Sequence, residues 1–134
     1  MDGGADAVVF CDTNGGSLPS DITAMIATAK TKTHLSVPMG IHTHNDSDLA
    51  VANALAAVNA GCQQVQGTIN GYGERTGNCN LTSVLANLQL KMGKQVVSPA
   101  HMSQLSELSL FVDESANQRP NSRAPFVGIS AFAH

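Results

Sequence analysis

Along the first hundred positions, short apolar runs alternate with longer segments in which apolar and polar residues are mixed. A short apolar run covers residues 7–11 and ends in the polar, glycine-rich stretch 12–16, which is typical of a strand buried on both faces. In the segment that follows, apolar residues recur at steps of three and four, and Pro19 suits the first turn of a helix that runs to about Thr33. The first unit is therefore predicted to be a strand followed by a helix.

The same order occurs twice more. We expect strands at residues 37–42 and 63–69, and helices at residues 49–60 and 81–92. Each of these two helices is closed by a glycine, Gly61 and Gly93, the residue favoured just past a helix end. Three strand-helix units in succession predict a parallel sheet with right-handed crossovers, and hence the α/β class.

The pattern changes after residue 96. Residues 101–116 carry a helical stripe of Leu105, Leu108, Phe111 and Val112, and residues 117–121 form a breaker-rich linker. The stretch 125–134 is apolar again. A complete (β/α)8 barrel needs roughly 250 residues, so this chain could hold about three of its eight units. We expect both ends to be cut from a longer protein.

Composition excludes several classes of function. The net charge is −3 without a basic run, and only 4% of residues are aromatic, so we expect no nucleic-acid partner. No apolar stretch is long enough for a membrane span and the N-terminus is acidic rather than basic, so we expect a cytoplasmic protein without a membrane partner. The three cysteines, Cys11, Cys62 and Cys79, are widely spaced and predicted to be buried, reduced thiols.

Two histidines stand at the end of the second predicted strand. His42 and His44 are two residues apart, so their side chains point to the same face, at the strand end where ligands of α/β sheets usually bind. Two imidazoles so placed can bind one divalent metal ion. Asn45 and Asp46 follow, and they could either orient the imidazoles or begin the next helix. The alternative is that the two histidines are hydrogen-bonded within the protein or exposed to solvent, and bind no metal.

The loops after the other two strands also carry polar candidates. Thr13 follows the first strand, where its hydroxyl and nearby N–H groups could hold a carboxylate, although an ordinary Asx-turn would need the same residues. The loop 70–78 fails the glycine spacing of a dinucleotide site. It offers Glu74 and Arg75 as an ion pair, and Asn78, whose amide oxygen could bind a hard metal ion. His101 is interpreted as structural or solvent-facing.

Three segments in register resemble one enzyme family. They are Cys11-Asp12-Thr13-Asn14-Gly15-Gly16, His42-Thr43-His44-Asn45-Asp46 and Gly71-Tyr72-Gly73-Glu74-Arg75-Thr76-Gly77-Asn78. Together they resemble the α-isopropylmalate, homocitrate and citramalate synthases of the DRE-TIM metallolyase superfamily. Residues 66–75 and 87–93 look most like the citramalate synthase branch. The resemblance covers essentially the whole chain.

The resemblance implies a partial TIM barrel over residues 1–100, and the last helix and start of a post-barrel linker over residues 101–134. His42 and His44 match the metal-binding histidines of the family and Asn78 the asparagine near the metal, which is Mg²⁺ or Mn²⁺. Thr13 matches the threonine that contacts the keto acid carboxylate. The aspartate ligand, the catalytic glutamate and a later histidine of the family have no counterpart here. Asp48 stands where the commoner pattern has glycine.

The implied reaction is a condensation of acetyl-CoA with a 2-oxo acid and release of CoA, in branched-chain amino acid biosynthesis. Pyruvate, giving citramalate, is favoured, and 2-oxoisovalerate, giving 2-isopropylmalate, stays open. No catalytic base can be named, so we expect the chain alone to be inactive, and we expect the full-length enzyme to be a homodimer. A half-barrel module that needs a partner chain is the non-catalytic alternative. An amidohydrolase is disfavoured because it needs further histidines and an aspartate on later strands.

Overall fold

Three consecutive strand-helix units form the first two thirds of the structure. The computed structural model describes residues 3–33 and 36–133. The three units are β1 (Val8–Asp12), α1 (Pro19–Thr33), β2 (Met39–Thr43), α2 (Ala50–Asn59), β3 (Gln64–Gln66) and α3 (Leu81–Ala86). The remaining elements are the short turns η1 (Ile69–Gly71), η2 (Asn87–Lys91) and η3 (Ile129–Phe132), and the helices α4 (Pro99–Ser103) and α5 (Leu105–Ser115). The strand-helix order matches the sequence prediction.

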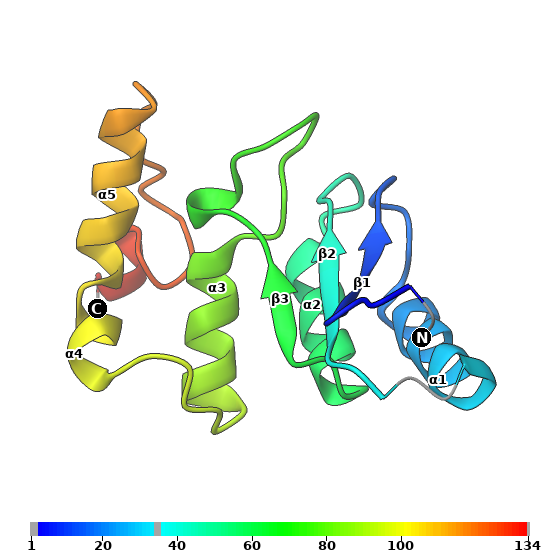
Figure 1. Cartoon of the computed structure of the whole chain (residues 1–134). Coiled ribbons are helices and arrows are strands. Elements are labelled where there is room, and N and C mark those ends of the chain that lie inside the picture. The colour runs from blue at the N-terminus through cyan, green and yellow to red at the C-terminus, as the bar shows by residue number, and fades with distance from the viewer. Residues whose placement is uncertain (1–2, 34–35, 134) are drawn as a thin grey trace.

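The three strands form a parallel sheet in the order β1-β2-β3. Its register pairs Cys11 with His42 and His42 with Gln66, so these three side chains lie in one row across the sheet. All three arrowheads in Figure 1 point to the same edge, where the loops that follow the strands lie. In that view the strands stand in front of α2, so helices cover one face of the sheet and leave the other open.

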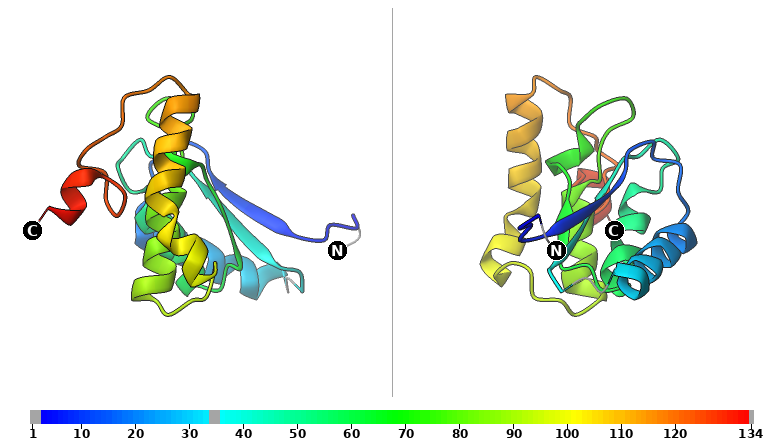
Figure 2. Two further views of the ribbon diagram at one scale, coloured as in Figure 1. Left: turned by 90° about the vertical axis from the view of Figure 1, so that its left-hand side faces the viewer. Right: turned by 45° about the vertical axis from the view of Figure 1, so that its right-hand side comes forward.

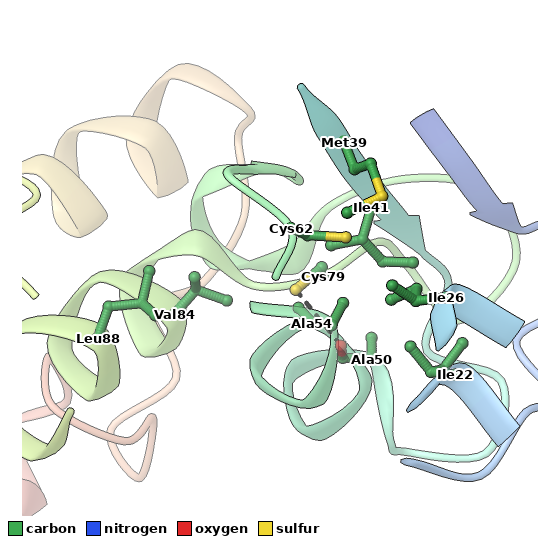
Figure 3. Close-up of a cluster of buried hydrophobic side chains, with 11 residues drawn as sticks. Ile22, Ile26, Met39, Ile41, Ala50, Ala54, Cys62, Cys79, Val84 and Leu88 are labelled. Atoms are coloured by element: carbon green, nitrogen blue, oxygen red, sulfur yellow. Dashed lines mark hydrogen bonds between the residues drawn. The ribbon is translucent and has the colours of Figure 1, made fainter. Parts of the chain in front are cut away.

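The covered face carries the main hydrophobic core (Figure 3). Met39 and Ile41 alternate along β2 and point toward the helices, where they meet Ile22 and Ile26 of α1. The core is completed by side chains of α2, α3, η2 and the loops: Ala50, Ala54, Ala57, Cys62, Cys79, Val84 and Leu88. The small alanines of α2 allow this helix to pack closely on the strands.

The third strand is shorter than predicted. It ends at Gln66, and Ile69 already belongs to the turn η1. The reason lies at Gly67, where an added Cβ would stand only 2.3 Å from the backbone oxygen of Cys79. The chain therefore turns away from the sheet here, and the Thr68 N–H donates to that same oxygen over 3.0 Å.

Two helix predictions need correction. The predicted helix 81–92 is α-helical only to Ala86, and it closes as the π-type turn η2, in which the Met92 N–H donates to the Asn87 carbonyl over 3.0 Å. The predicted helix 101–116 is two helices that meet at Gln104. The first begins earlier than expected, at Pro99, because the Ser98 hydroxyl accepts the His101 N–H and caps it.

Only part of the apolar stripe predicted for α5 faces this chain: Leu105 is buried and Val112 is half-buried, but the other two residues are not. Leu108 is 40% exposed and Phe111 65% exposed. The buried face is instead the row of Leu105, Ser109 and Asp113. This row is largely polar because it bonds to the loop after β3, which stands beside α5 (Figures 1 and 2). The bonds run from Asn70 Nδ2 to the Ser109 carbonyl over 2.9 Å, and from the Tyr72 hydroxyl to Asp113 Oδ1 over 2.6 Å.

The cysteines divide between the two faces. Cys62 and Cys79 are buried as predicted, and burial raises the pKa of the Cys79 thiol to about 11. The prediction is wrong for Cys11, which is exposed because it points from β1 to the open face. Within residues 3–33 and 36–133, no helix combines the length and apolarity needed to cross a membrane.

Candidate metal centre

His42 and His44 come together at the loop edge of the sheet. Their ring centroids are 5.2 Å apart and their ring planes are inclined by 57°. His42 stands on β2, where its Nδ1 lies 3.3 Å from Oε1 of Gln66 on the neighbouring strand. His44 follows just beyond β2 and is only 7% exposed. The two imidazoles therefore occupy one side of the strand end, as their spacing predicted.

Asn78 is brought beside His44 by the way the loop after β3 returns to the sheet. The two residues form an isolated backbone bridge. On either side of this bridge, the Asn45 N–H donates to Gly77 and the Cys79 N–H donates to Thr43, each over 3.0 Å. The cluster of predicted metal-binding residues is thus made of His42 on β2, His44 just beyond β2 and Asn78 in the loop after β3, whose main chain pairs with that of His44.

Two atoms of this cluster are buried without a hydrogen-bond partner. They are Nδ1 of His44 and Oδ1 of Asn78, and in the part of the chain that the structure describes only Asn53 Oδ1 shares this property. Buried polar atoms are normally paired, so unpaired ones call for an explanation. An imidazole nitrogen and an amide oxygen are both suitable ligands for a divalent cation, so these residues fit a metal ion.

The set of donors is nevertheless small. Over residues 3–33 and 36–133 the structure holds no cluster of three or more His, Cys, Asp and Glu side chains that could bind a metal. Mg²⁺ prefers six oxygen ligands in an octahedron, and two imidazoles with one amide oxygen fill only part of that requirement. Further ligands would have to come from a substrate, water or another part of a protein.

Thr13 lies exposed at the end of β1, in a turn that neighbouring residues hold in place. The turn is anchored by Asp12, whose buried carboxylate accepts from the Ser17 hydroxyl over 3.0 Å and from Asn53 Nδ2 over 3.4 Å. Gly15 has a φ of +61° and presses against Asp46. Asp12 therefore anchors the turn, and Thr13, the next residue, is exposed.

The side chain of Asn45 bonds to the start of the next helix, which begins at Ala50. Its Oδ1 accepts the Ala50 N–H over 3.1 Å, and its Nδ2 donates to Asp48 Oδ1 over 3.2 Å. Asp48 has a φ of +59°, in the left-handed region that glycine adopts most easily. Aspartate is one of the residues that tolerate this region, which explains how it replaces the glycine of the commoner pattern. His101 is exposed on α4, as expected.

The main ion pair of the site is one that the sequence did not predict. Arg75 contacts Glu74 only at 3.7 Å, but it makes two short bonds to Asp46, Nε to Oδ1 at 2.8 Å and Nη2 to Oδ2 at 2.9 Å. These bonds hold the pKa of the Asp46 carboxyl below its usual value and raise the pKa of Arg75. The sequence held one signal for this ion pair, since Asp46 and Arg75 carry opposite charges and lie in loops that follow neighbouring strands.

A comparison with known protein families matches the HMGL-like family to residues 1–112. The chain belongs to the HMGL-like family. Among HMGL-like relatives, the (R)-citramalate synthase of Geobacter sulfurreducens is 50% identical over the whole chain, which covers 25% of that relative. The 2-isopropylmalate synthase of Methanocaldococcus jannaschii is 40% identical over the same span and is also covered to 25%.

Among solved structures, the HMG-CoA lyase of Bacillus subtilis aligns with a TM-score of 0.75 at 18% identity, over 91% of this chain and 42% of that one. This likeness concerns the fold, and it confirms the prediction of a partial barrel of three strand-helix units. The resemblance noted in the sequence is confirmed as well. The HMGL-like chain spans about a quarter of the length of the curated relatives that it matches.

Proposed function

We propose that this chain is the metal- and keto-acid-binding part of an acyltransferase that condenses acetyl-CoA with a 2-oxo acid and releases CoA. The observation that carries the proposal is the cluster of His42, His44 and Asn78 at the loop edge, with its two unpaired buried atoms. The 50% identity to a citramalate synthase supports pyruvate as the 2-oxo acid, in the isoleucine branch of amino acid biosynthesis.

In this proposal the side chains have separate tasks. His42, His44 and Asn78 would hold Mg²⁺ or Mn²⁺, which when bound makes the keto carbon of the substrate more electrophilic. Thr13, on the adjacent loop, donates its hydroxyl hydrogen to the substrate carboxylate and orients it. Residues 1–100 form part of the catalytic barrel, and residues 101–134 form its last helix and the start of a linker. The complete enzyme is a cytoplasmic homodimer.

A second substrate has a specific observation in its favour. The match to a 2-isopropylmalate synthase at 40% identity supports 2-oxoisovalerate as the alternative 2-oxo acid. The metal-binding residues and Thr13 have the same tasks for either substrate, because both substrates present a carboxylate next to a ketone. The choice between them therefore depends on the groups that surround the alkyl end of the 2-oxo acid.

The test is a hybrid in which residues 1–134 replace the matching quarter of the Geobacter sulfurreducens citramalate synthase. CoA release is followed with Mn²⁺ and with either pyruvate or 2-oxoisovalerate. We expect the hybrid to turn over pyruvate, and His44→Ala to lower kcat/KM at least about 100-fold, since a direct metal ligand matters more than the groups that orient it. His101→Ala, exposed on α4, is the matched control. Full activity of the His44→Ala hybrid would contradict the proposal, and the 134-residue chain alone serves as the inactive blank.

A further inference from the structure

The side chain of Arg75 connects the loops that follow all three strands. It belongs to the loop after β3, and it contacts Asp46 in the loop after β2 through Nε and Nη2. The same Nη2 donates to the backbone oxygen of Thr13, in the loop after β1, over 2.7 Å. A single guanidinium thus makes three hydrogen bonds of 2.7–2.9 Å to two neighbouring loops.

The backbone around this contact is folded tightly. Arg75 itself has a φ of +54°, a conformation that residues other than glycine adopt only when their surroundings hold them there. An added Cβ at Gly15 would lie 2.5 Å from Oδ2 of Asp46, so the turn after β1 rests directly on the carboxylate that Arg75 binds. An added Cβ at Gly77 would lie 2.1 Å from the backbone oxygen of Gly71, which closes the loop of Arg75 on itself. Movement of one loop therefore requires movement of the others.

Only arginine can make this set of contacts. Its planar guanidinium presents several N–H donors in a fixed fork, so it can bind a carboxylate with two donors and still reach a further oxygen. Lysine would offer one compact charge and could not keep both partners in the same geometry. Glu74 contributes little to holding the guanidinium in place, because it is exposed and its Oε2 lies 3.7 Å from Nη1 of Arg75. The functional bonds are those to Asp46 and Thr13.

We propose that Arg75 is a positioning residue for the carboxylate of the 2-oxo acid, and that it acts through the main chain of Thr13. The inference rests on the proposed function, in which the Thr13 hydroxyl binds that carboxylate. Asp46 fixes the guanidinium, the guanidinium fixes the Thr13 carbonyl, and the hydroxyl is thereby held on the same side as His42 and His44. Arg75 itself does not need to touch the substrate.

The test is a double-mutant cycle in the hybrid enzyme described above. Arg75→Gln is compared in the Thr13 background and in the Thr13→Val background, with KM measured for pyruvate and for acetyl-CoA. In the Thr13 background we expect KM for pyruvate to rise roughly tenfold or more, the scale of losing a charge-assisted hydrogen bond, while KM for acetyl-CoA stays within about twofold. In the Thr13→Val background we expect Arg75→Gln to add less than about twofold.

Two outcomes would overturn the proposal. If the effects of Arg75→Gln and Thr13→Val multiply, Arg75 does not act through Thr13. If Arg75→Lys restores KM for pyruvate completely, attraction between opposite charges suffices and the fork has no positioning role. Should Thr13→Val turn over too slowly for kinetics, the Kd of pyruvate measured by calorimetry in the presence of Mn²⁺ completes the cycle.

Controls separate this result from the proposed function. Lys32→Gln removes one positive charge from the exposed end of α1 and should leave both KM values unchanged. An inactive hybrid without any of these substitutions would count against the proposed function. An active hybrid whose Arg75 and Thr13 effects are independent would count against the positioning role alone.

Discussion

The two faces of the three-stranded sheet differ in what their side chains contact. On β2, Met39 and Ile41 point to the covered face and are buried against helices, whereas His42 points to the open face, as a side chain at Gly40 would. The neighbouring strands add Val9 and the exposed Cys11 of β1, and the polar Gln64 and Gln66 of β3, to this open face. Because side chains alternate along a strand, five consecutive residues carry both the core and part of the candidate metal centre. Stability and chemistry should therefore separate at neighbouring positions.

The strongest test of this separation compares two adjacent residues of β2. Ile41 is fully buried, so we expect Ile41→Ala to lower the free energy of unfolding by about 2–5 kcal/mol, from lost apolar contacts and the cavity left behind. His42 lies on the open face, and His42→Ala should change the free energy of unfolding by less than about 0.5 kcal/mol. Urea unfolding followed by circular dichroism measures both values.

The same pair of variants should behave in the opposite way toward metal. We expect His42→Ala to weaken Mn²⁺ binding in calorimetry, and Ile41→Ala to leave it unchanged under conditions where the variant is folded. If His42→Ala lowers the free energy of unfolding as much as Ile41→Ala does, stability and metal binding are not separated between the two faces.

The fold could be predicted from the sequence wherever the signal was local. Pro19 marked the first residue of α1, and Gly61 and Gly93 follow their helices with positive φ values. The end of β3 could not be predicted, because the contact that shortens the strand joins Gly67 to the backbone of Cys79, twelve positions away. The polar buried face of α5 was missed for the same reason, since its partners lie in the loop after β3.

The candidate site shows the same limit. The two-residue spacing of His42 and His44 predicted that they share a side, because side chains alternate along an extended chain and this is a local property. The partner of Arg75 was predicted to be its neighbour Glu74, whereas the structure pairs it with Asp46, 29 positions earlier. Which loops touch depends on the register of the strands, which no local pattern contains.

A smaller effect on the free energy of unfolding should come from raising the pH, through a thiol on the covered face. Burial raises the pKa of the Cys79 thiol from 9.0 to about 11, so the folded state holds this proton more tightly than the unfolded chain. The stability that this contributes is fully present below pH 9 and is lost as the pH rises toward 11. Between pH 8 and pH 10.5 we expect a loss of about 1–2 kcal/mol.

The measurement is urea unfolding at both pH values, for the natural chain and for Cys79→Ala. The variant lacks the titrating thiol, so its unfolding free energy should fall less between the two pH values, whatever its starting stability. Cys11→Ala is the matched control from the open face and should keep the slope of the natural chain. Equal slopes in all three proteins would show that Cys79 does not account for the pH dependence.

The smallest expected effect is on the open face, at Gly40. An added Cβ there would lie 2.7 Å from Oε1 of Gln64 and 3.1 Å from Cγ2 of Val9, so the neighbouring strands leave little room. The nearest atom is the far end of a flexible side chain, which can move. Alanine also loses less conformational freedom on folding than glycine does, which offsets part of the crowding. We therefore expect Gly40→Ala to cost less than about 1 kcal/mol, and Gln64→Ala in the same chain to restore the loss. A cost similar to that of Ile41→Ala would mean that the open face is packed as tightly as the core.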